Sequence, residues 1–226
     1  SRVLFWGNWG VSNDECPMLP EDMTGMTAIE LGCGTGYVSA WMAHRGATVT
    51  AIDNSERQLA TARNLAGEYH IDIDFLHGNA ESVPRSDATF DFAISEYGAA
   101  IWCDPEAWIP EAHRLLTPGG KLVFLGNSPL SAICSPMDGA PVDRILHRDY
   151  FTLGRLDWTE VSIDPGGVEF NRSLSAWFTL FRDVGFRVDD YKEPVAFVAK
   201  HSIDSSVSAE WAQSYPSEQV WFLTKV

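Results

Sequence analysis

Glu30-Leu31-Gly32-Cys33-Gly34-Thr35-Gly36 is the stretch of this sequence that decides its fold. It closes an apolar run at residues 27–31 and opens a helical pattern, in which Val38, Trp41 and Met42 follow the i, i+3, i+4 spacing. Glycines at such a turn let the chain bend sharply and let a ligand approach where a Cβ would collide. The helix that follows offers unpaired N–H groups at its start. The stretch therefore predicts a strand–turn–helix unit that binds a ligand.

Strand-like and helical stretches alternate along most of the chain. Helix starts are indicated by the capping box at Ser55, by Asp104-Pro105 and by Ser173. Strands are expected at 27–31, 48–52, 73–77, 90–95, 121–125, 186–191 and 220–224. This alternation predicts an α/β protein with a doubly wound, mostly parallel seven-stranded sheet, a reversed final strand and an insertion after the fifth strand.

The pattern divides the chain into four parts. The ligand-binding core is expected at 27–126, and its closing helix and strand pair at 173–226. Residues 127–172 form a Pro-, Gly- and aromatic-rich insertion of poor periodicity, which we expect to cap an acceptor pocket, because long loops in compact domains are usually functional. Residues 1–26 precede the core as a predicted lid, in which Trp6 and Trp9 can fold over the ligand.

Charge restricts the partners. The formal net charge is -15, from 31 acidic and 16 basic residues, whereas binding to nucleic acid or an anionic membrane requires clustered basic residues. A small molecule is therefore the expected partner. The oligomeric state is left open. The four cysteines show no disulfide or metal-site spacing, and no apolar run approaches the ~20 residues of a membrane span, so a cytoplasmic protein is expected.

Asp53 ends the second predicted strand, where a carboxylate can accept both hydroxyl protons of a ribose. The ligand is therefore expected to be a nucleoside. The dinucleotide fingerprint G-x-G-x-x-G/A fails in both frames, because Tyr37 and Ser39 stand at the last position. Glu30 suits an ammonium group better than a pyrophosphate, which argues against a nicotinamide cofactor.

The glycine-rich stretch resembles the (D/E)xGxGxG motif of the class I S-adenosylmethionine-dependent methyltransferases, which have a Rossmann-like fold. Asp53 matches the ribose-binding acid of that family, and 78–81 the segment beside the adenine, although many relatives have Asp where this chain has Asn79. Residues 90–95 and 114–122 resemble two further motifs. The resemblance implies S-adenosyl-L-methionine as cofactor, held by Glu30, Gly32, Cys33, Gly34, Gly36, Asp53, Asn54, Gln58, Asn79, Ala80, Glu81 and Ser95.

The likeness is to the branch that methylates small molecules, since Ser95-Glu96-Tyr97-Gly98 lacks the Asn/Asp-Pro-Pro-Tyr of nucleic-acid amino methyltransferases. We expect a metal-free, in-line methyl transfer, with oxygen as the favoured acceptor atom. Positioning supplies most of the catalysis in such a displacement. Glu96 and His147 are the candidate catalytic residues, and Glu96 can equally serve as an acceptor for a nearby loop N–H.

Other candidates for the acceptor side come from the two long excursions. His201 is a further possible base. Trp158 and Phe151 are the expected apolar wall, and Arg144, Arg148 and Arg155 can hold a carboxylate or remain solvated. Three alternatives stay open at this point: a nicotinamide-dependent oxidoreductase, a non-catalytic S-adenosylmethionine-binding protein, and a transferase that uses a related alkyl donor.

Overall fold

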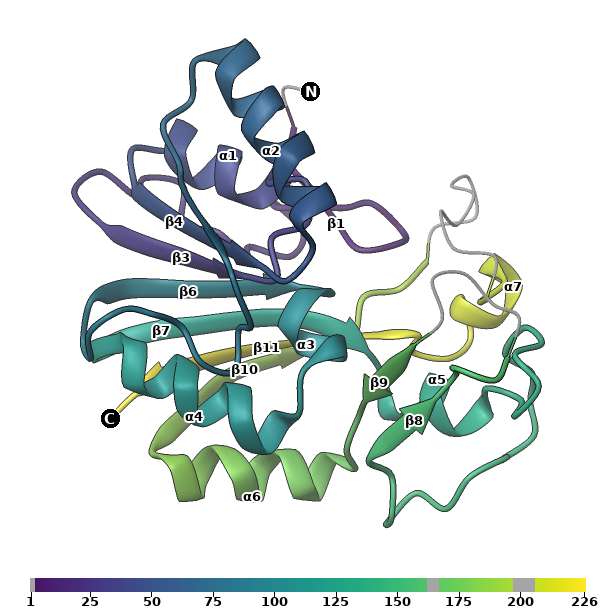
Figure 1. The fold of residues 1–226 in the computed structure, drawn as a ribbon. Coiled ribbons are helices and arrows are strands. Elements are labelled where there is room, and N and C mark those ends of the chain that lie inside the picture. The colour runs from purple at the N-terminus through teal and green to yellow at the C-terminus, as the bar shows by residue number, and fades with distance from the viewer. Residues whose placement is uncertain (1–2, 162–166, 197–205) are drawn as a thin grey trace.

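A seven-stranded sheet organises the chain in the computed structural model, which describes residues 3–161, 167–196 and 206–226 (Figure 1). The strand order is β10-β11-β7-β6-β3-β4-β5, and β11 alone runs antiparallel to its neighbours. The sheet prediction is confirmed, including the reversed final strand. The bounds are β3 Thr27–Leu31, β4 Thr48–Asp53, β5 Asp74–His77, β6 Phe90–Glu96, β7 Leu116–Asn127, β10 Phe186–Lys192 and β11 Glu218–Lys225.

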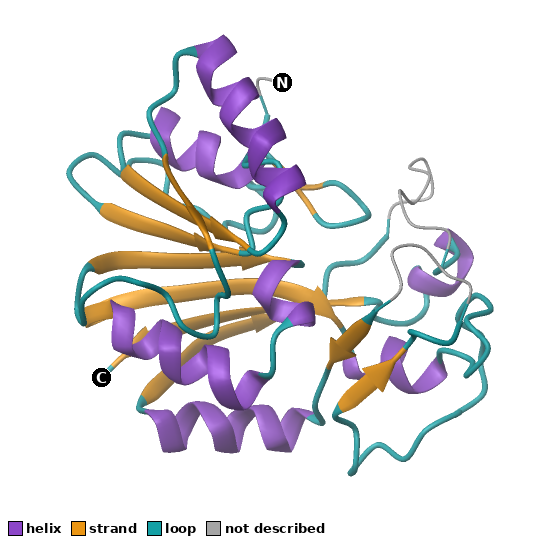
Figure 2. Cartoon of the chain, in the orientation of Figure 1, coloured by secondary structure: helices purple, strands orange, loops and turns teal. Residues whose placement is uncertain are grey.

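Helices cover both faces of the sheet (Figure 2). On one face, α1 Tyr37–His44 and α2 Glu56–Tyr69 pack through buried residues such as Met42 and Leu59. The other face carries α3 Gly98–Trp102, α4 Pro105–Leu115 and α6 Leu174–Val184, with Trp108 and Trp177 in its core. Tyr69, the last residue of α2, is exposed.

The predicted helix starts are confirmed. The side chains of Ser55, Asp104 and Ser173 accept hydrogen bonds from backbone N–H groups two or three residues ahead, which satisfies donors that a helix start leaves unpaired. The capping box at Ser55 is completed differently from expectation. The Ser55 N–H is bound by Asp53 Oδ1 at 2.8 Å, so the start of α2 is tied to the ligand-side acid.

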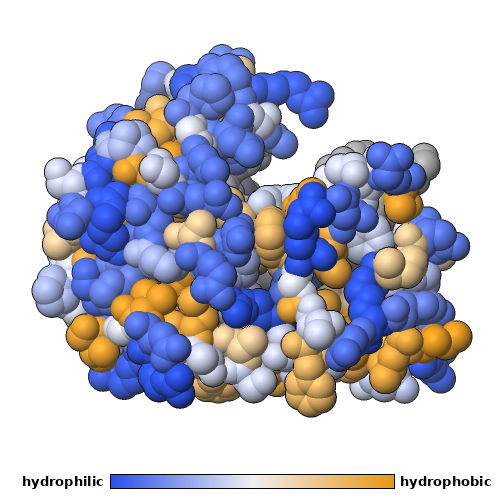
Figure 3. All heavy atoms as spheres, turned by 60° about the horizontal axis from the view of Figure 1, so that its bottom comes forward, coloured by the Kyte–Doolittle hydropathy of each residue, from blue (hydrophilic) through white to orange (hydrophobic). Residues whose placement is uncertain are grey.

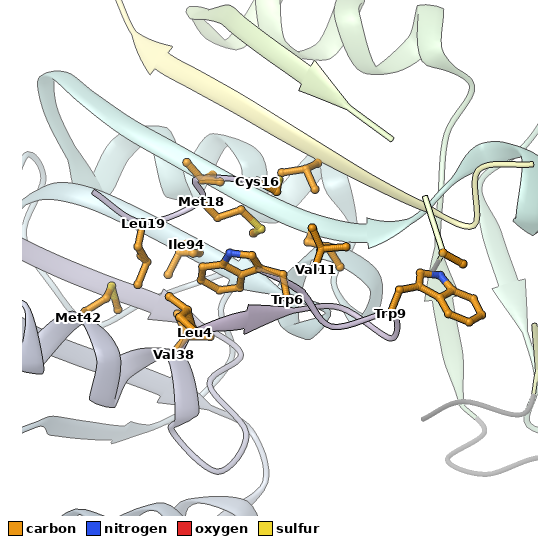
Figure 4. Packing of buried hydrophobic residues seen from close by; sticks show 14 of the residues in the cluster. Leu4, Trp6, Trp9, Val11, Cys16, Met18, Leu19, Val38, Met42 and Ile94 are labelled. Carbon is orange, nitrogen blue, oxygen red and sulfur yellow. The ribbon is translucent and has the colours of Figure 1, made fainter. Parts of the chain in front are cut away.

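The N-terminal segment is part of the core. Strands β1 Phe5–Trp6 and β2 Val11–Ser12 form a hairpin, and the Trp6 side chain is 1% exposed. Figure 4 shows Trp6 among Val11, Met18 and Ile94 of β6. Trp9 is equally buried, and its indole N–H donates to Ser217 Oγ at 2.7 Å. The two tryptophans therefore anchor this segment to the sheet and do not form a loose cover.

The insertion builds a smaller lobe beside the sheet, which contains α5 Pro129–Cys134, β8 Arg155–Asp157 and β9 Val168–Phe170, and which α7 Ala209–Ala212 joins from the C-terminal part (Figure 1). Buried polar side chains attach the lobe to the end of β7. Asn171 donates to the Asn127 carbonyl at 2.8 Å, and Ser128 N–H donates to the Ser217 carbonyl at 2.9 Å. No helix in the described part of the chain is long and apolar enough to cross a membrane.

Candidate donor-binding site

A cavity of about 620 Å³ lies at the carboxyl ends of β3, β4 and β6. The strand order reverses between β3 and β6, and open α/β sheets bind ligands at such a switch point. Figure 3 shows the surface hollowed between the sheet-bearing part and the smaller lobe. Eight of the fourteen predicted site residues line the cavity: Gly32, Gly34, Asp53, Asn54, Gln58, Asn79, Ala80 and Glu96.

The glycine-rich turn forms one wall of the cavity. Gly32 has a φ of 78°, and a Cβ there would lie 2.6 Å from the Gly98 Cα, so this position serves backbone packing. Gly34 also has a positive φ, of 52°, but a Cβ there would meet no heavy atom within 4 Å. The space beside Gly34 is therefore open to a ligand that can approach the backbone.

Asp53 is held in place by the backbone around it. Its Oδ2 accepts the Gly34 N–H at 2.8 Å, and its Oδ1 accepts the Ser55 N–H at the same distance. A carboxylate has about four acceptor sites, so two remain for hydroxyl donors. The acid is thus oriented at the cavity wall with the capacity to bind a ribose diol.

Asn79 and Ala80 line the cavity after β5, but the Asn79 amide is engaged. Its Oδ1 accepts the Glu81 N–H at 3.0 Å, and its Nδ2 donates to Glu81 Oε2 at 3.1 Å. Glu81 in turn accepts the Asp104 N–H at 2.8 Å and does not line the cavity. Glu81 therefore shapes the loop at this end of the cavity.

Glu30 also lies behind the cavity wall. Its Oε2 accepts the Ser39 N–H at 2.8 Å and the Ser39 hydroxyl, both from α1. Burial raises the pKa of Glu30 to about 8, although the Ser39 hydrogen bonds oppose that shift. Glu30 is not part of the cavity lining, because alternate residues of β3 face α1 and its carboxylate points that way; its contact with an ammonium group stays a prediction.

Cys33, Gly36 and Ser95 lie outside the lining as well. Ser95 Oγ donates to the Leu31 carbonyl at 2.7 Å and accepts the Ala100 N–H at 3.1 Å, which ties β6 to β3 and α3. Gly36 is the left-handed N-cap of α1, and the Cys33 thiol is buried. These residues support the cavity from behind, and their contact with the donor stays a prediction.

Nine of the lining residues are not among the predicted site residues, and Trp102 and Val168 are the two that add a large side chain from another element. Trp102 ends the short helix α3, is 36% exposed and lines the cavity beside Cys103. Val168 of β9 brings the insertion to the same cavity. The sequence does contain a signal for Trp102. Cys103-Asp104-Pro105 follows it directly, and Asp-Pro starts the next helix, so Trp102 must end the preceding element. No local signal marks Val168.

Glu96 lies at the end of β6 and accepts a loop N–H, as expected, whereas its catalytic role stays a prediction. It lines the cavity, and its Oε1 accepts the Gly7 N–H at 2.7 Å from the N-terminal hairpin turn. Burial raises the pKa of Glu96 to about 7; the Gly7 hydrogen bond lowers it, and the nearby Glu218 carboxylate raises it further.

Known proteins share both the sequence of this region and the whole fold. A family model described as a methyltransferase domain matches residues 29–124. Malonyl-[acyl-carrier protein] O-methyltransferase of Pectobacterium atrosepticum is 37% identical over 103 residues, which are 45% of this chain and 38% of that protein. Ubiquinone biosynthesis O-methyltransferase of Maricaulis maris is 33% identical over 100 residues, 44% of this chain and 39% of that protein. The chain thus spans less than half the length of these relatives.

The crystal structure of an S-adenosylmethionine-dependent methyltransferase from Mesorhizobium loti is similar over 93% of this chain and 95% of that chain, with a TM-score of 0.72 and 25% identity. Residues 29–124 thus match a methyltransferase domain, and the chain has the fold of the S-adenosylmethionine-dependent methyltransferases. S-Adenosylmethionine is therefore the cofactor that the fold implies, and the nicotinamide alternative is dropped. The open space beside Gly34 and the acceptor sites of Asp53 fit that cofactor.

His147 is not brought to the cavity. Its Nε2 lies 3.0 Å from Asp143 Oδ1, four residues earlier in the chain, and its backbone N–H donates to the Ile133 carbonyl. The pair folds with the lobe around α5, away from the cavity lining. A catalytic role for His147 is therefore not supported by its position. His201 lies outside the described residues.

The other acceptor-side candidates are also engaged elsewhere. Arg148 donates to the Ala132 carbonyl at 3.1 Å and lies over the ring of Trp158, which is buried. Arg155 pairs with Asp157, Arg144 with Glu210, and Phe151 is 83% exposed. None of these five predicted residues lines the cavity.

The described residues contain neither a candidate metal site nor a disulfide. Among the described residues no three His, Cys, Asp or Glu side chains gather as a metal site, and the metal-free reaction stays a prediction. All four cysteines are free thiols, in agreement with the sequence spacing.

Proposed function

We propose that the chain transfers the methyl group of S-adenosylmethionine to an oxygen atom of a small-molecule acceptor, by in-line displacement and without a metal. The observation that carries this proposal is the oriented Asp53 carboxylate, which two backbone N–H groups hold beside the open face of Gly34. The match to a methyltransferase domain supports the donor, and the O-methyltransferase names of the two curated relatives support the acceptor atom.

The donor is held by the cavity lining in this proposal. Asp53 binds the ribose hydroxyls, and Gly34 leaves the backbone accessible. Asn54, Gln58, Asn79 and Ala80 surround the nucleoside end, where Trp102 adds an aromatic face. The donor supplies an already activated methyl group on a sulfonium, so the task of these residues is to fix its orientation.

The acceptor binds where the insertion meets the sheet. Val168 of β9 reaches the cavity, and a Cβ built on its neighbour Gly167 lies 3.7 Å from the Trp102 ring. This contact supports the role of residues 127–172 as an acceptor cap. The net charge of -15 supports a small molecule over nucleic acid or an anionic membrane as the partner.

The test is calorimetric titration of S-adenosylmethionine, its demethylated product and NADH against the wild type, Asp53→Ala and a control, Asp72→Ala. Asp72 is an exposed acid just before β5 and does not line the cavity. The wild type and the control are expected to bind the first two compounds with micromolar affinity. Asp53→Ala should lose at least about tenfold, as two hydrogen bonds to a charged group are removed.

Two outcomes contradict the proposal. Binding of NADH alone would redirect the search to redox chemistry. Equal donor affinity in Asp53→Ala and Asp72→Ala would show that Asp53 does not face the ribose. Release of the demethylated product with an acceptor present then separates an enzyme from a non-catalytic binding protein.

A further inference from the structure

One oxygen of Glu96 is committed to the fold and the other is not. Oε1 accepts the Gly7 N–H at 2.7 Å, which fixes the direction of the carboxylate. For Oε2, no hydrogen-bond partner is found among the described residues, and the Glu96 side chain lines the cavity. An acceptor oxygen is thus pre-oriented at the end of β6, with its neighbour Tyr97 beside it in the same lining.

A second carboxylate acts on Glu96 from the start of β11, two strands away in the sheet. Glu218 begins β11, accepts the Asn8 N–H at 2.7 Å, and accepts a short hydrogen bond from the Tyr97 hydroxyl. The hairpin turn therefore donates one N–H to each carboxylate, through Gly7 and Asn8. The two acids are close enough for the Glu218 carboxylate to raise the pKa of Glu96, and Glu96 is the one that lines the cavity.

The cavity has no positive side chain to balance these acids. Its lining contains Asp53 and Glu96 and no Lys, Arg or His among the described residues. The arginines of the insertion that can bind a carboxylate are paired with Asp157 or Glu210, or with backbone carbonyls. An acceptor that brings its own carboxylate to this end would face like charges without compensation.

We propose that the reacting group of the acceptor is a neutral, weakly acidic hydroxyl, of the phenol or enol kind, and that Glu96 Oε2 takes its proton, with Glu218 as a positioning residue. This inference rests on the proposed function and names its acceptor class. As the acceptor oxygen forms its bond to the methyl carbon, the methyl–sulfur bond breaks and its electron pair stays on sulfur. The hydroxyl proton passes to Glu96 and from there to water.

The electrostatics agree with this assignment. A pKa of about 7 for Glu96 places a carboxylate base near neutral pH, where general bases are most effective. The titratable groups around it are Glu218 from β11, Glu30 from β3 and Tyr97, while the Gly7-Asn8-Trp9 turn contributes none. Burial and the Glu218 carboxylate raise the pKa of Glu96, and the Gly7 N–H lowers it.

The decisive experiment compares two ligands of the donor site by calorimetry. S-Adenosylhomocysteine is a neutral thioether, whereas sinefungin carries a protonated amine where the donor has its methyl group. We expect the wild type to bind sinefungin at least tenfold more tightly than the thioether at pH 8, and less selectively at pH 6. In Glu96→Gln the preference should fall below about threefold while thioether affinity stays within twofold, as one charge-assisted hydrogen bond is lost.

Glu68→Gln, an exposed glutamate of α2, is the matched control and should keep the wild-type preference. If Glu96→Gln retains the preference, or weakens both ligands equally, Glu96 only holds the hairpin turn and the inference fails. Loss of all donor-site binding in the wild type would instead contradict the proposed function. The melting temperature of Glu96→Gln, in which the amide oxygen can still accept the Gly7 N–H, checks that the variant folds.

The acceptor class is tested with a matched pair of probes, 2-naphthol and 2-naphthoate, titrated into the wild type with S-adenosylhomocysteine bound. The wild type is expected to bind 2-naphthol at least tenfold more tightly than 2-naphthoate. In Glu96→Gln this difference in affinity should become smaller, because the variant no longer repels the carboxylate of 2-naphthoate. Absence of a preference for 2-naphthol in the wild type, or a preference for 2-naphthoate, overturns the hydroxyl assignment.

Discussion

The donor side and the acceptor side of the cavity are held together over very different distances along the chain. On the donor side, Asp53 binds the N–H groups of Gly34 and Ser55, which are 19 and 2 residues away. On the acceptor side, Glu96 binds Gly7, 89 residues away, and the Asn8 N–H is bound 210 residues away by the carboxylate that opens β11.

The difference has a physical consequence. A strand–turn–helix unit positions the donor-side groups by its own backbone geometry, so these groups are in place wherever the unit folds. The acceptor-side groups depend on the N-terminal hairpin, β6 and β11 meeting in the completed sheet. The acceptor side should therefore be lost first when long-range packing is weakened.

Trp6→Ala tests this dependence with the largest expected effect. The indole is fully buried against β6 and donates to Asn13 Oδ1 at 3.2 Å, so the truncation should lower the free energy of unfolding by about 3–5 kcal/mol. Urea denaturation followed by circular dichroism measures it. Trp102→Ala, which removes a tryptophan that is 36% exposed, is the control and should cost about 1 kcal/mol.

The same pair of variants can break the comparison. If Trp6→Ala has the wild-type free energy of unfolding, the packing of the N-terminal segment on the sheet does not stabilise the fold. In that case the hairpin would act as the separable lid that the sequence suggested, and the acceptor side would not depend on it.

Glu30→Gln addresses the donor side through pH. Because burial raises the folded-state pKa of Glu30 to about 8, the native state binds more protons than the unfolded state between the ordinary carboxyl pKa and about pH 8. Stability should therefore fall as pH rises through this window, with a slope of at most about 1.4 kcal/mol per pH unit for one group. Glu30→Gln should flatten the part of the slope due to Glu30 in melts between pH 5 and 8.

Glu96 titrates in an overlapping range, so Glu96→Gln is the companion variant. If neither substitution changes the slope of stability against pH, other groups control the pH dependence. Burial then does not raise the pKa of Glu30 or Glu96 enough to affect stability in this range. If the slope of stability against pH changes in Glu96→Gln but not in Glu30→Gln, the ionisation of Glu96 on the acceptor side causes the pH dependence.

The same contrast explains how much could be predicted from the sequence. The sheet, the helix starts and the donor-side residues Gly34 and Asp53 follow from spacing and local capping, which act over a few residues. Glu30 was placed correctly on its strand, but its side chain faces α1, since the choice of face depends on what packs above the sheet. Glu218 was not predicted at all, because its partner Asn8 is far away in the sequence.

The insertion shows the limit most clearly. Its aromatic and basic residues suggested an acceptor pocket, yet Trp158 is buried under Arg148, and Val168 is the insertion residue that lines the cavity. Composition indicates that such a segment contains a functional surface, but only its folded path determines which side chains face the ligand. The position of Trp102 was not predicted for the same reason. Trp102 is the last residue of α3, a helix of five residues, and its side chain lines the cavity.

Phe151→Ala has the smallest expected effect and tests that limit. The ring was predicted to wall the acceptor pocket, but it is 83% exposed and stacks edge-on with Tyr150 at a centroid distance of 5.5 Å. Its removal should change the free energy of unfolding by less than about 0.5 kcal/mol and leave the binding of 2-naphthol unchanged. Val168→Ala is the matched comparison, because it shortens a side chain of the same insertion that lines the cavity, and should weaken 2-naphthol several-fold. If Phe151→Ala loses more binding than Val168→Ala, the insertion must close over the acceptor and bring Phe151 into the cavity. The acceptor side would then have a second conformation, which the donor side does not need.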